Sequence, residues 1–394
     1  MAAEPTSGTA HPLRILMVLE SNFTKRGGGG AESQLKTLAG HLRRLGHQVT
    51  VLTPMLARGP QIAAERCYGL PVARLPYPRR KLIGAAIMEA RMAAFLWQRR
   101  KRYDAWHVHI GHNMGAITCL LGSWLRKPVV VKISGWWELD RGLLAPGWRP
   151  LAVLGRSWLK KASAVQAIST RIAAELVKQG FPPDRILVLP NAVDTARFSV
   201  RTTPRAEGTP FTAVFVGRLV PEKDLGTLFD AWATAFRGRN DVRLRLVGEG
   251  GEEKALRAQA EQLGITAQIE FLGHRDDVEA VLAMADVGVL PSRIEGLSNT
   301  LLEFMASGLP TLASQVSGSE DFVVTDRNGW LFPVGDAATL ARGLSEACAL
   351  APARLLEMGV QARRDVEAAS ALDIVVGKLL ALYRGASPRD LKKG

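Results

Sequence analysis

The 394-residue sequence has little of what marks a secreted, zinc-binding or membrane-spanning protein. Its three cysteines, Cys67, Cys119 and Cys348, lie far apart and form no CxxC pair, so neither a disulfide framework nor a zinc site is indicated. Lone cysteines of this kind are usually small core residues. No run approaches 18 consecutive apolar residues, and residues 1–11 are too polar for a signal peptide. We therefore expect a protein of a reducing compartment, the cytoplasm.

Several nucleotide-binding and metal-binding motifs are also missing. The loop GGGGAE (27–32) lacks the GxGxxG spacing, and the next apolar run closes in LTP without an acidic residue. It does not match GxxxxGK[ST] either. These absences argue against a nicotinamide enzyme and against a P-loop ATPase. The sequence contains no DxD, so we expect no bound metal and no other cofactor.

Positive charge is concentrated in the first half of the chain. Residues 1–194 hold 28 Lys and Arg against 11 Asp and Glu, whereas residues 195–394 hold 23 against 26. This asymmetry predicts a polyanionic partner such as anionic lipid, nucleic acid or a charged glycan, although a solvated basic face is the alternative. Nucleic acid is the weaker candidate because no reading motif accompanies the charge.

One segment of that half, residues 74–106, combines basic and aromatic residues around an apolar helical stretch. They are Arg79, Arg80, Lys81, Arg99, Arg100, Lys101 and Arg102, interleaved with Tyr77, Phe95, Trp97, Tyr103 and Trp106. This composition suits a surface that lies on an anionic bilayer, and we expect peripheral placement on the inner face of the plasma membrane. The alternative is an ordinary helix whose apolar side faces the core.

Strand-length apolar runs alternate with helical patterns along most of the chain. In the first half the runs are residues 13–20, 48–54, 105–110, 128–134, 164–169 and 185–191. After the segment SVRTTPRAEGTP (199–210) they resume at residues 211–217, 243–250, 269–273, 287–292, 309–314 and 328–333. Alternation of this kind predicts parallel sheets covered on both faces, and the polar segment 199–210 reads as a linker. Two doubly wound domains would leave a ligand-binding cleft at the carboxyl ends of their strands.

Two acidic residues and a basic loop stand out in the second half. Glu295 and Glu303 occur in EGLSNTLLE after an apolar strand, where a helix N-terminus favours an anion. Glu303 is expected about two turns into that helix, on nearly the same face as Glu295. Arg218 and Lys223, in VGRLVPEKD, suit a pyrophosphate leaving group. Each pattern alone could equally be an ordinary helix start or a solvated basic loop.

Three histidines gather at the end of a strand in AWHVHIGHN (105–113). His107 and His109 share one side of that strand, and His112 follows. No carboxylate nearby completes a metal-ligand set. A substrate-contacting imidazole and a structural histidine both remain open.

These motifs coincide in order with those of a known family. GGGGAE, HVH, VGRLVPEKD and EGLSNTLLE, with LPNAVD (189–194), LVGEG (246–250), FLGHRDDV (271–278) and NGWLFPVGD (328–336), resemble glycosyltransferase family four. The resemblance covers residues 13 to about 385. It implies the α/β GT-B fold, in which two Rossmann-like doubly wound domains face a central cleft and a C-terminal helix crosses back to the first domain.

The resemblance also implies domain limits. Residues 1–12 would form a disordered tail, 13–198 an acceptor-side domain, 199–210 the linker, 211–370 the nucleotide-sugar domain and 371–394 the returning helix. The implied activity is metal-independent, retaining transfer of a hexosyl group, with UDP-sugar expected as the commonest donor class. The acceptor would be a glycan or a lipid-linked molecule of cell-envelope or polysaccharide synthesis.

The resemblance further assigns roles to individual positions. Gly29 and Gly30 would lie near the donor phosphate and acceptor, and His109 would contact the transferred sugar. Arg218 and Lys223 would clamp the diphosphate, Glu295 would touch the sugar hydroxyls, and Glu303 would bind the ribose. Backbone contacts would come from Gly296, Leu297, Ser298 and Asn299. Arg275 would belong to the stretch beside the base.

Two departures from the family pattern fall on the acceptor side. Ser134-Gly135 stands where relatives often carry histidine-glycine, and Ala192 stands where glycine is common. The acceptor therefore cannot be carried over from the family. Two other readings keep the fold: a catalytically silent protein that binds a membrane or partner, and a nucleotide-sugar epimerase.

Overall fold

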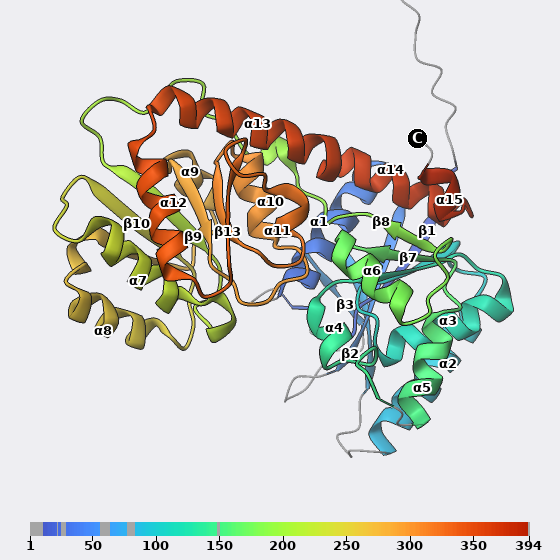
Figure 1. The fold of residues 1–394 in the computed structure, drawn as a ribbon. Helices are drawn as coiled ribbons and strands as arrows, with labels where there is room; N and C mark the ends of the chain where they lie inside the picture. The colour runs from blue at the N-terminus through green and yellow to red at the C-terminus, as the bar shows by residue number, and fades with distance from the viewer. Residues whose placement is uncertain are drawn as a thin grey trace, which may run out of the picture.

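The computed structural model of the protein describes residues 11–21, 23–24, 29–55, 64–76, 83–147 and 150–392. Figure 1 shows two lobes, each built on a sheet. In these residues the first sheet has the strand order β3-β4-β2-β1-β5-β6-β7-β8, and the second has the order β11-β10-β9-β12-β13-β14. We call the part around the first sheet the first domain and the part around the second sheet the second domain.

The strands of the first domain are β1 (Arg14–Val18), β2 (Gln48–Met55), β3 (Ala64–Cys67), β4 (Leu70–Pro76), β5 (Ala105–Val108), β6 (Val129–Ile133), β7 (Ala164–Ala167) and β8 (Ile186–Val188). Its helices are α1 (Gly30–Arg44), α2 (Ile83–Gln98), α3 (Asn113–Leu125), α4 (Trp136–Asp140), α5 (Pro150–Leu159) and α6 (Thr170–Lys178). β1 shows why the sheet is covered on both faces. Ile15 and Met17 pack with residues of α1, whereas Leu16 and Val18 pack with residues of α2 and α3.

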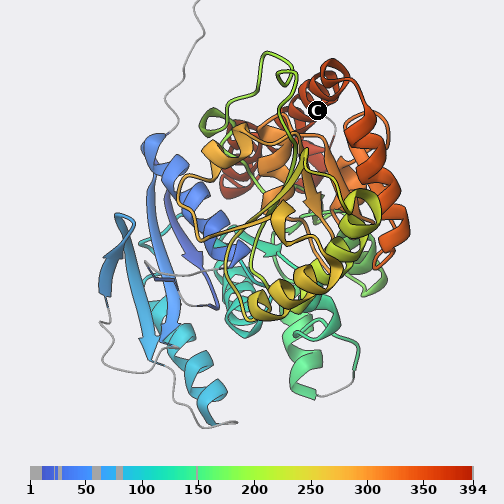
Figure 2. The same ribbon diagram turned by 90° about the vertical axis from the view of Figure 1, so that its left-hand side faces the viewer.

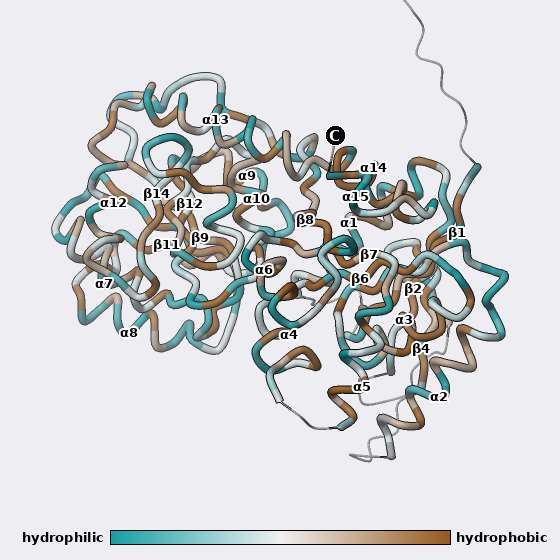
Figure 3. The backbone as a smooth tube through the Cα atoms, turned by 45° about the vertical axis from the view of Figure 1, so that its right-hand side comes forward, coloured by the Kyte–Doolittle hydropathy of each residue, from teal (hydrophilic) through white to brown (hydrophobic). Residues whose placement is uncertain are grey.

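The strands of the second domain are β9 (Phe211–Val216), β10 (Val242–Val247), β11 (Ile269–Gly273), β12 (Val287–Leu290), β13 (Thr311–Ser314) and β14 (Gly329–Phe332). Its helices are α7 (Leu225–Phe236), α8 (Glu253–Leu263), α9 (Val278–Ala283), α10 (Asn299–Ala306), α11 (Ser319–Phe322) and α12 (Ala337–Ala349). Short 3-10 turns are η1 (Thr195–Arg197), η2 (Pro221–Lys223) and η3 (Thr266–Gln268). The strands pair in parallel, and Figure 3 shows apolar segments gathered along them.

The chain returns to the first domain at its end. α13 (Pro352–Ser370) passes along one side of the molecule, and α14 (Leu372–Tyr383) and α15 (Pro388–Leu391) follow it (Figure 1). α14 packs on α1, and its buried residues Val375, Leu379 and Tyr383 join the cluster that contains Ile15. The first-domain core is therefore completed by residues more than 350 positions away in the sequence.

A hairpin at the edge of the first sheet differs from the expected all-parallel arrangement. β3 pairs antiparallel with β4, which in turn pairs parallel with β2, and Figure 2 shows these strands at the sheet edge. The expected basic helical segment 74–106 therefore begins in a strand, because Arg74 to Pro76 belong to β4. Gly69 in the turn and the two prolines of β4 hide the strand pattern, and both prolines lie near the ends of the strand, Pro71 at its second residue and Pro76 at its last.

The same segment supplies fewer surface aromatics than the sequence suggested. Tyr103 and Trp106 are buried in the core, 5% and 0% exposed, so they cannot form part of a membrane-facing surface. Trp97 is half exposed, and Phe95 is partly buried. Tyr77, Arg79, Arg80 and Lys81 lie outside the described residues, as do residues 1–10 of the expected tail.

The strand orders fix where ligands can bind. In the first sheet the chain leaves β1 toward β2 on one side and returns to β5 on the other, and in the second sheet β9 has the same relation to β10 and β12. At such a switch point the loops after the two central strands diverge and leave a crevice at the carboxyl ends. These loops follow β1, β5, β9 and β12, and they carry the four motifs that the sequence singled out.

Candidate active site

The glycine loop after β1 faces the second domain. Gly29 and Gly30 stand at the start of α1, where the Glu32 carboxylate accepts a 2.7 Å hydrogen bond from the Gly29 amide and another from the Ser21 hydroxyl. The Asn299 side-chain amide donates to the Gly30 carbonyl at 3.2 Å. Glu32 therefore links the two described sides of the loop, and Gly30 contacts α10 directly. Gly27 and Gly28 lie outside the described residues.

The loops after β9 and β12 bring a lysine and a glutamate together. Lys223 ends the short turn η2, and its ammonium forms an ion pair with the carboxylate of Glu295. The Ser292 hydroxyl donates to the same carboxylate at 3.1 Å. Both charged side chains are mostly buried, 19% and 18% exposed, so their attraction is less screened than on an open surface. An incoming phosphate would compete with Glu295 for the Lys223 ammonium.

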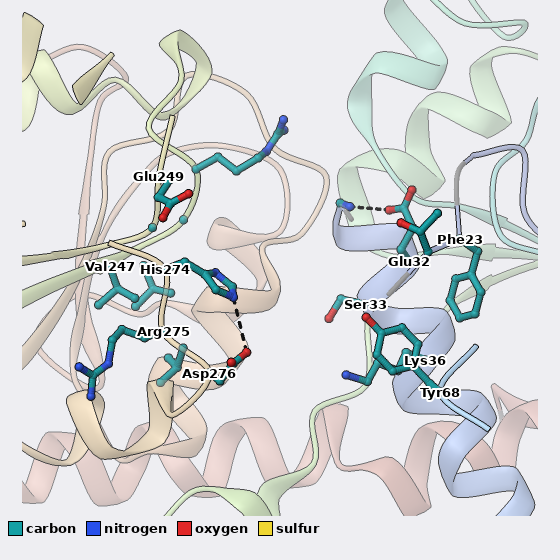
Figure 4. A pocket seen from close by; sticks show the side chains of 17 residues that line it. Phe23, Glu32, Ser33, Lys36, Tyr68, Val247, Glu249, His274, Arg275 and Asp276 are labelled. Atoms are coloured by element: carbon teal, nitrogen blue, oxygen red, sulfur yellow. Dashed lines mark hydrogen bonds and ion pairs between the residues drawn. The ribbon is translucent and has the colours of Figure 1, made fainter. Parts of the chain in front are cut away.

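Arg218 stands apart from this pair in the described structure. It is exposed, and it lines a cleft cavity of about 560 Å³ together with Gly217. The cavity has walls from both domains (Figure 4). Its other lining residues are Phe23, Thr24, Gly29, Glu32, Ser33, Lys36, Tyr68, Val216, Val247, Gly248, Glu249, His274, Arg275, Asp276 and Val278. Arg218 therefore faces open ligand space, whereas Lys223 is already paired.

Arg275 lies on the second-domain wall of the same cavity. Its guanidinium forms a two-point ion pair with Asp277 at 2.8 and 2.7 Å. Next to it, His274 pairs with Asp276 at 3.5 Å (Figure 4). This wall faces Ser33 and Lys36 across the opening. The wall thus combines polar groups with apolar lining residues such as Val247.

Glu303 is closer to the start of its helix than the sequence suggested. α10 begins at Asn299, so Glu303 lies about one turn into it, and Glu295 precedes the helix rather than sharing its face. Burial raises the pKa of Glu303 to about 7, against the smaller opposing effect of Arg197. Arg197 itself donates to the Glu279 carboxylate at 2.6 and 3.0 Å. A carboxyl group that titrates near neutrality is therefore held beside an arginine that another acid already engages.

The segment between Glu295 and α10 forms one of the contacts between the domains. A Cβ on Gly296 would lie 2.9 Å from the Gly135 Cα, so only glycine fits where the backbones meet. The Asn191 side-chain amide donates to the Leu297 carbonyl at 3.2 Å and to the Asn299 side chain at 2.8 Å. Ser298 is buried and precedes the helix. Asn191 was missed as a site residue, although LPNAVD contains it.

The paired histidines are buried beneath the cleft. His107 and His109 stack with ring centroids 4.3 Å apart, so the expectation that they share one side of the strand is confirmed. The Tyr383 hydroxyl hydrogen-bonds the His107 Nδ1 at 2.6 Å. His109 is 0% exposed, and burial holds its pKa well below the usual value, so it is neutral. Contact between His109 and a sugar would therefore require its surroundings to move.

Two buried ionisable residues near these histidines, Lys132 and Glu138, were not predicted from the sequence. Burial lowers the pKa of Lys132 to about 7 and raises that of Glu138 to about 7. The Glu138 carboxylate accepts hydrogen bonds from the amides of Gly111, Ser134 and Gly135, at 2.6 to 2.9 Å. Glu138 thus ties the loop after β5 to the loop after β6. A lysine inside the apolar run PVVVKIS was the available signal.

The part of the chain that the structure describes contains neither a metal-ligand cluster nor a helix that could span a membrane. No three His, Cys, Asp or Glu side chains lie close enough together there to hold a metal ion. Over the same residues, no helix combines the length and apolar character needed to cross a bilayer.

Two Rossmann-like domains with facing switch points and a returning C-terminal helix define a GT-B glycosyltransferase fold. The comparisons with known proteins agree. The model for glycosyltransferase family 4 matches residues 28–197, and that for glycosyl transferases group 1 matches residues 210–349. The chain belongs to the group 1, family 4 glycosyltransferases.

Individual proteins and solved structures of this kind also resemble the chain. The chain is 33% identical, over 53% of each sequence, to the glycosyltransferase WcaL of Escherichia coli, which is named for colanic acid biosynthesis. It thus spans about half the length of that relative. It is 27% identical to a GDP-mannose-dependent alpha-mannosyltransferase of Mycolicibacterium smegmatis, over 96% of this chain and 98% of the relative. The UDP complex of Anabaena Alr3699/HepE matches with a TM-score of 0.76 and 19% identity, over 95% of this chain and all of that one.

Proposed function

We propose that the protein transfers a hexosyl group from a nucleotide-sugar to a glycan or lipid-linked acceptor, with retention of anomeric configuration and without a metal ion. Family membership supports the reaction class. The observation that carries the proposal is the Lys223–Glu295 pair at the second switch point, beside the start of α10. The Lys223 ammonium suits a phosphate, and the Glu295 carboxylate suits sugar hydroxyls. The N-terminus of α10 suits the negative charge that develops on the leaving group.

The transfer step follows from these groups. The bond between the anomeric carbon and the β-phosphate oxygen breaks, and a bond from that carbon to the acceptor hydroxyl oxygen forms on the same face. The acceptor proton passes to the departing β-phosphate oxygen, so no side-chain nucleophile is required. Negative charge grows on the diphosphate, where Lys223, Arg218 and the α10 N-terminus would stabilise it. Glu295 would then be free to accept hydrogen bonds from the sugar.

A UDP-sugar is the donor that we propose, and GDP-mannose is the named competitor. UDP is bound in the Anabaena structure of the same fold, whereas the mycobacterial relative is named for GDP-mannose. A thermal-shift screen against UDP, GDP, ADP and their sugars separates these cases. A ligand at 100 times its dissociation constant stabilises a protein by about 2.7 kcal/mol. Stabilisation by GDP-mannose alone would replace the donor and leave the reaction class intact.

An acceptor in cell-envelope or polysaccharide synthesis is proposed from two observations. WcaL is named for colanic acid, a polysaccharide, and the first half of this chain is strongly basic. Around the end of α2, Arg99 and Arg100 lie over the rings of Phe95 and Trp97, at 4.3 and 4.7 Å. Cations beside an exposed indole suit the interface of an anionic bilayer. We therefore propose peripheral membrane binding through the first domain.

Two other functions are compatible with this fold. One is a catalytically silent protein that binds a membrane or a partner, and the other is a nucleotide-sugar epimerase. One assay without acceptor discriminates all three readings. A transferase releases nucleoside diphosphate slowly by transfer to water, an epimerase changes the sugar without net release, and a silent protein does neither. With an acceptor in hand, proton NMR of the first product reports its anomeric configuration, and inversion would contradict the proposed retention.

A further inference from the structure

Three neighbouring strands of the first sheet end in a cluster that the proposed reaction has not used. β1, β5 and β6 are adjacent and parallel, so the loops after them meet at one edge. Glu20 follows β1, His112 follows β5 and Trp137 follows β6. The Glu20 carboxylate contacts the His112 Nδ1 at 2.8 Å and accepts a hydrogen bond from the Met114 amide at 2.7 Å. The carboxylate therefore fixes both the imidazole and the start of α3.

The acid also sets the chemistry of the imidazole. A histidine that donates from Nδ1 to a carboxylate presents its Nε2 for a second hydrogen bond. The imidazole is one-third exposed, and Glu20 is one-fifth exposed, so this edge is open to a ligand. Hydrogen bonding to Glu20 raises the pKa of His112, with a smaller contribution from Glu138. Protonation makes Nε2 a donor to an oxygen atom.

Trp137 supplies an aromatic surface next to that imidazole. Its ring centroid lies 6.5 Å from that of His112, and 44% of the residue is exposed. Burial of a large ring is the norm, so an exposed indole beside a polar group indicates a recognition surface. The loop beneath it is fixed, because Glu138 accepts the amide hydrogens of Ser134 and Gly135. The indole is thus presented by a rigid support.

The cluster lies at the point where the domains touch. Gly135, two residues before Trp137, is the residue against which Gly296 packs. Gly296 in turn follows Glu295, which pairs with Lys223. A ligand on Trp137 would therefore lie near the Glu295–Gly296 loop, which we assign to the donor sugar.

We propose that Trp137, His112 and Glu20 form an acceptor subsite that binds a saccharide unit, with the sugar ring on the indole and a sugar oxygen on the His112 Nε2. Glu20 is a positioning residue that acts through His112. This inference rests on the proposed function, since it places the acceptor opposite the donor loop. A flat apolar ring with one fixed polar group is the combination that holds a sugar, which has both C–H faces and hydroxyl edges.

A glycan array tests the subsite with the full chain in the presence of UDP. The array carries defined mono- to tetrasaccharides that are neutral, bear uronic acid or are phosphorylated. We expect wild type to bind a subset of the glycans. The affinity of Trp137→Ala and of His112→Ala for these glycans should be lower by about tenfold or more. Trp137→Phe keeps an aromatic ring and should recover part of the binding. Trp124→Ala, on the exposed Trp of α3 that is 68% accessible, is the matched control and should bind as wild type does.

Unchanged glycan binding by both Trp137→Ala and His112→Ala would overturn the subsite, as would the absence of any glycan binding by wild type. Thermal shift with UDP is recorded for each variant and should not change, because none of these residues belongs to the donor loops. That readout keeps the two ideas apart. If no nucleotide stabilises wild type, the proposed donor chemistry fails, while Trp137-dependent glycan binding would still support the subsite.

Discussion

Lys223 and Glu295 form an ion pair, which has a consequence for the proposed donor binding. In the proposed mechanism a diphosphate would weaken this ion pair, because the Lys223 ammonium would divide its three N–H donors between the phosphate and Glu295. The Glu295 carboxylate would then be available to sugar hydroxyls. Until then the attraction between the two charges offsets the cost of removing them from water.

Lys223→Ala should lower turnover by about two to three orders of magnitude, because one electrostatic donor to the leaving group is lost. Arg218→Ala should act in the same direction. Steady-state release of nucleoside diphosphate measures both effects, and circular dichroism checks that the variants are folded. Lys254→Ala, on the exposed face of α8 in the same domain, serves as the control. Near-wild-type turnover in a folded Lys223→Ala protein would show that the clamp is misassigned.

Glu303 should make donor binding depend on pH. Its pKa of about 7 means that the carboxylate form, which in the proposed function would accept hydrogen bonds from ribose hydroxyls, grows from a minor to the major species between pH 6 and pH 8. Affinity for an intact UDP-sugar, whose phosphates do not titrate in this range, should therefore rise by up to about tenfold. Isothermal titration calorimetry at the two pH values measures it. In Glu303→Gln the rise should disappear, and an equal rise in that variant would assign the pH dependence elsewhere.

Residue types and their spacing predicted where the candidate charged residues lie, but not their partners. Lys223 and Glu295 lie in the loops after β9 and β12, and Glu303 lies on the helix that follows β12, as expected for groups near the carboxyl edge of a parallel sheet. Their roles in a reaction stay predictions. The pairing of Lys223 with Glu295 joins loops 72 positions apart, and the hydrogen bonds of Asn191 join different domains. No local pattern encodes either contact. The buried state of His109 likewise depends on how elements pack around it.

At the scale of elements, α14 is part of the first-domain core although it comes last in the chain. Leu379 is fully buried among residues of that core, whereas Ile374 on the same helix is 40% exposed. Leu379→Ala should lower the free energy of unfolding by about 2–5 kcal/mol through lost burial and the cavity left behind. Ile374→Ala should change it by about 0.5 kcal/mol or less.

Urea denaturation followed by far-UV circular dichroism compares these two variants under one condition. Equal, small losses for both would mean that α14 contributes little to first-domain stability and could be detached without cost.

The sequence predicted the alternation of strands and helices well, because buried parallel strands are continuous apolar runs. Each expected run overlaps a strand of the structure, with β2 and β10 extending one residue beyond their runs. The hairpin of β3 and β4 was not predicted, since two prolines, a glycine and the charged Arg74 break its apolar pattern. Arg74 is buried nonetheless, where its guanidinium bonds the Phe23 carbonyl at 2.7 Å and pairs with Glu65. A long-range partner of that kind cannot be read from local periodicity.

At the scale of the whole molecule, the uneven charge predicts membrane binding by one domain. Replacing Arg99, Arg100, Lys101 and Arg102 by Gln should weaken co-sedimentation with anionic vesicles by about fivefold for each residue, at about 1 kcal/mol per basic side chain. Neutralising Lys254 and Arg257, which are exposed in the second domain, should have little effect. Binding should also fall as salt rises. Equal binding of wild type to neutral vesicles would contradict this electrostatic docking.

The measurement that tests the central claim most directly is release of nucleoside diphosphate from a panel of UDP-, GDP- and ADP-sugars, in excess EDTA, by wild type and Lys223→Ala. We predict release from at least one nucleotide-sugar, an unchanged rate in chelator, and a loss of about 100-fold or more in the variant. Activity that vanishes in EDTA and returns with magnesium or manganese would contradict the metal-independent mechanism. Absence of release from every donor, with and without glycan acceptors, would contradict the assignment as a glycosyltransferase.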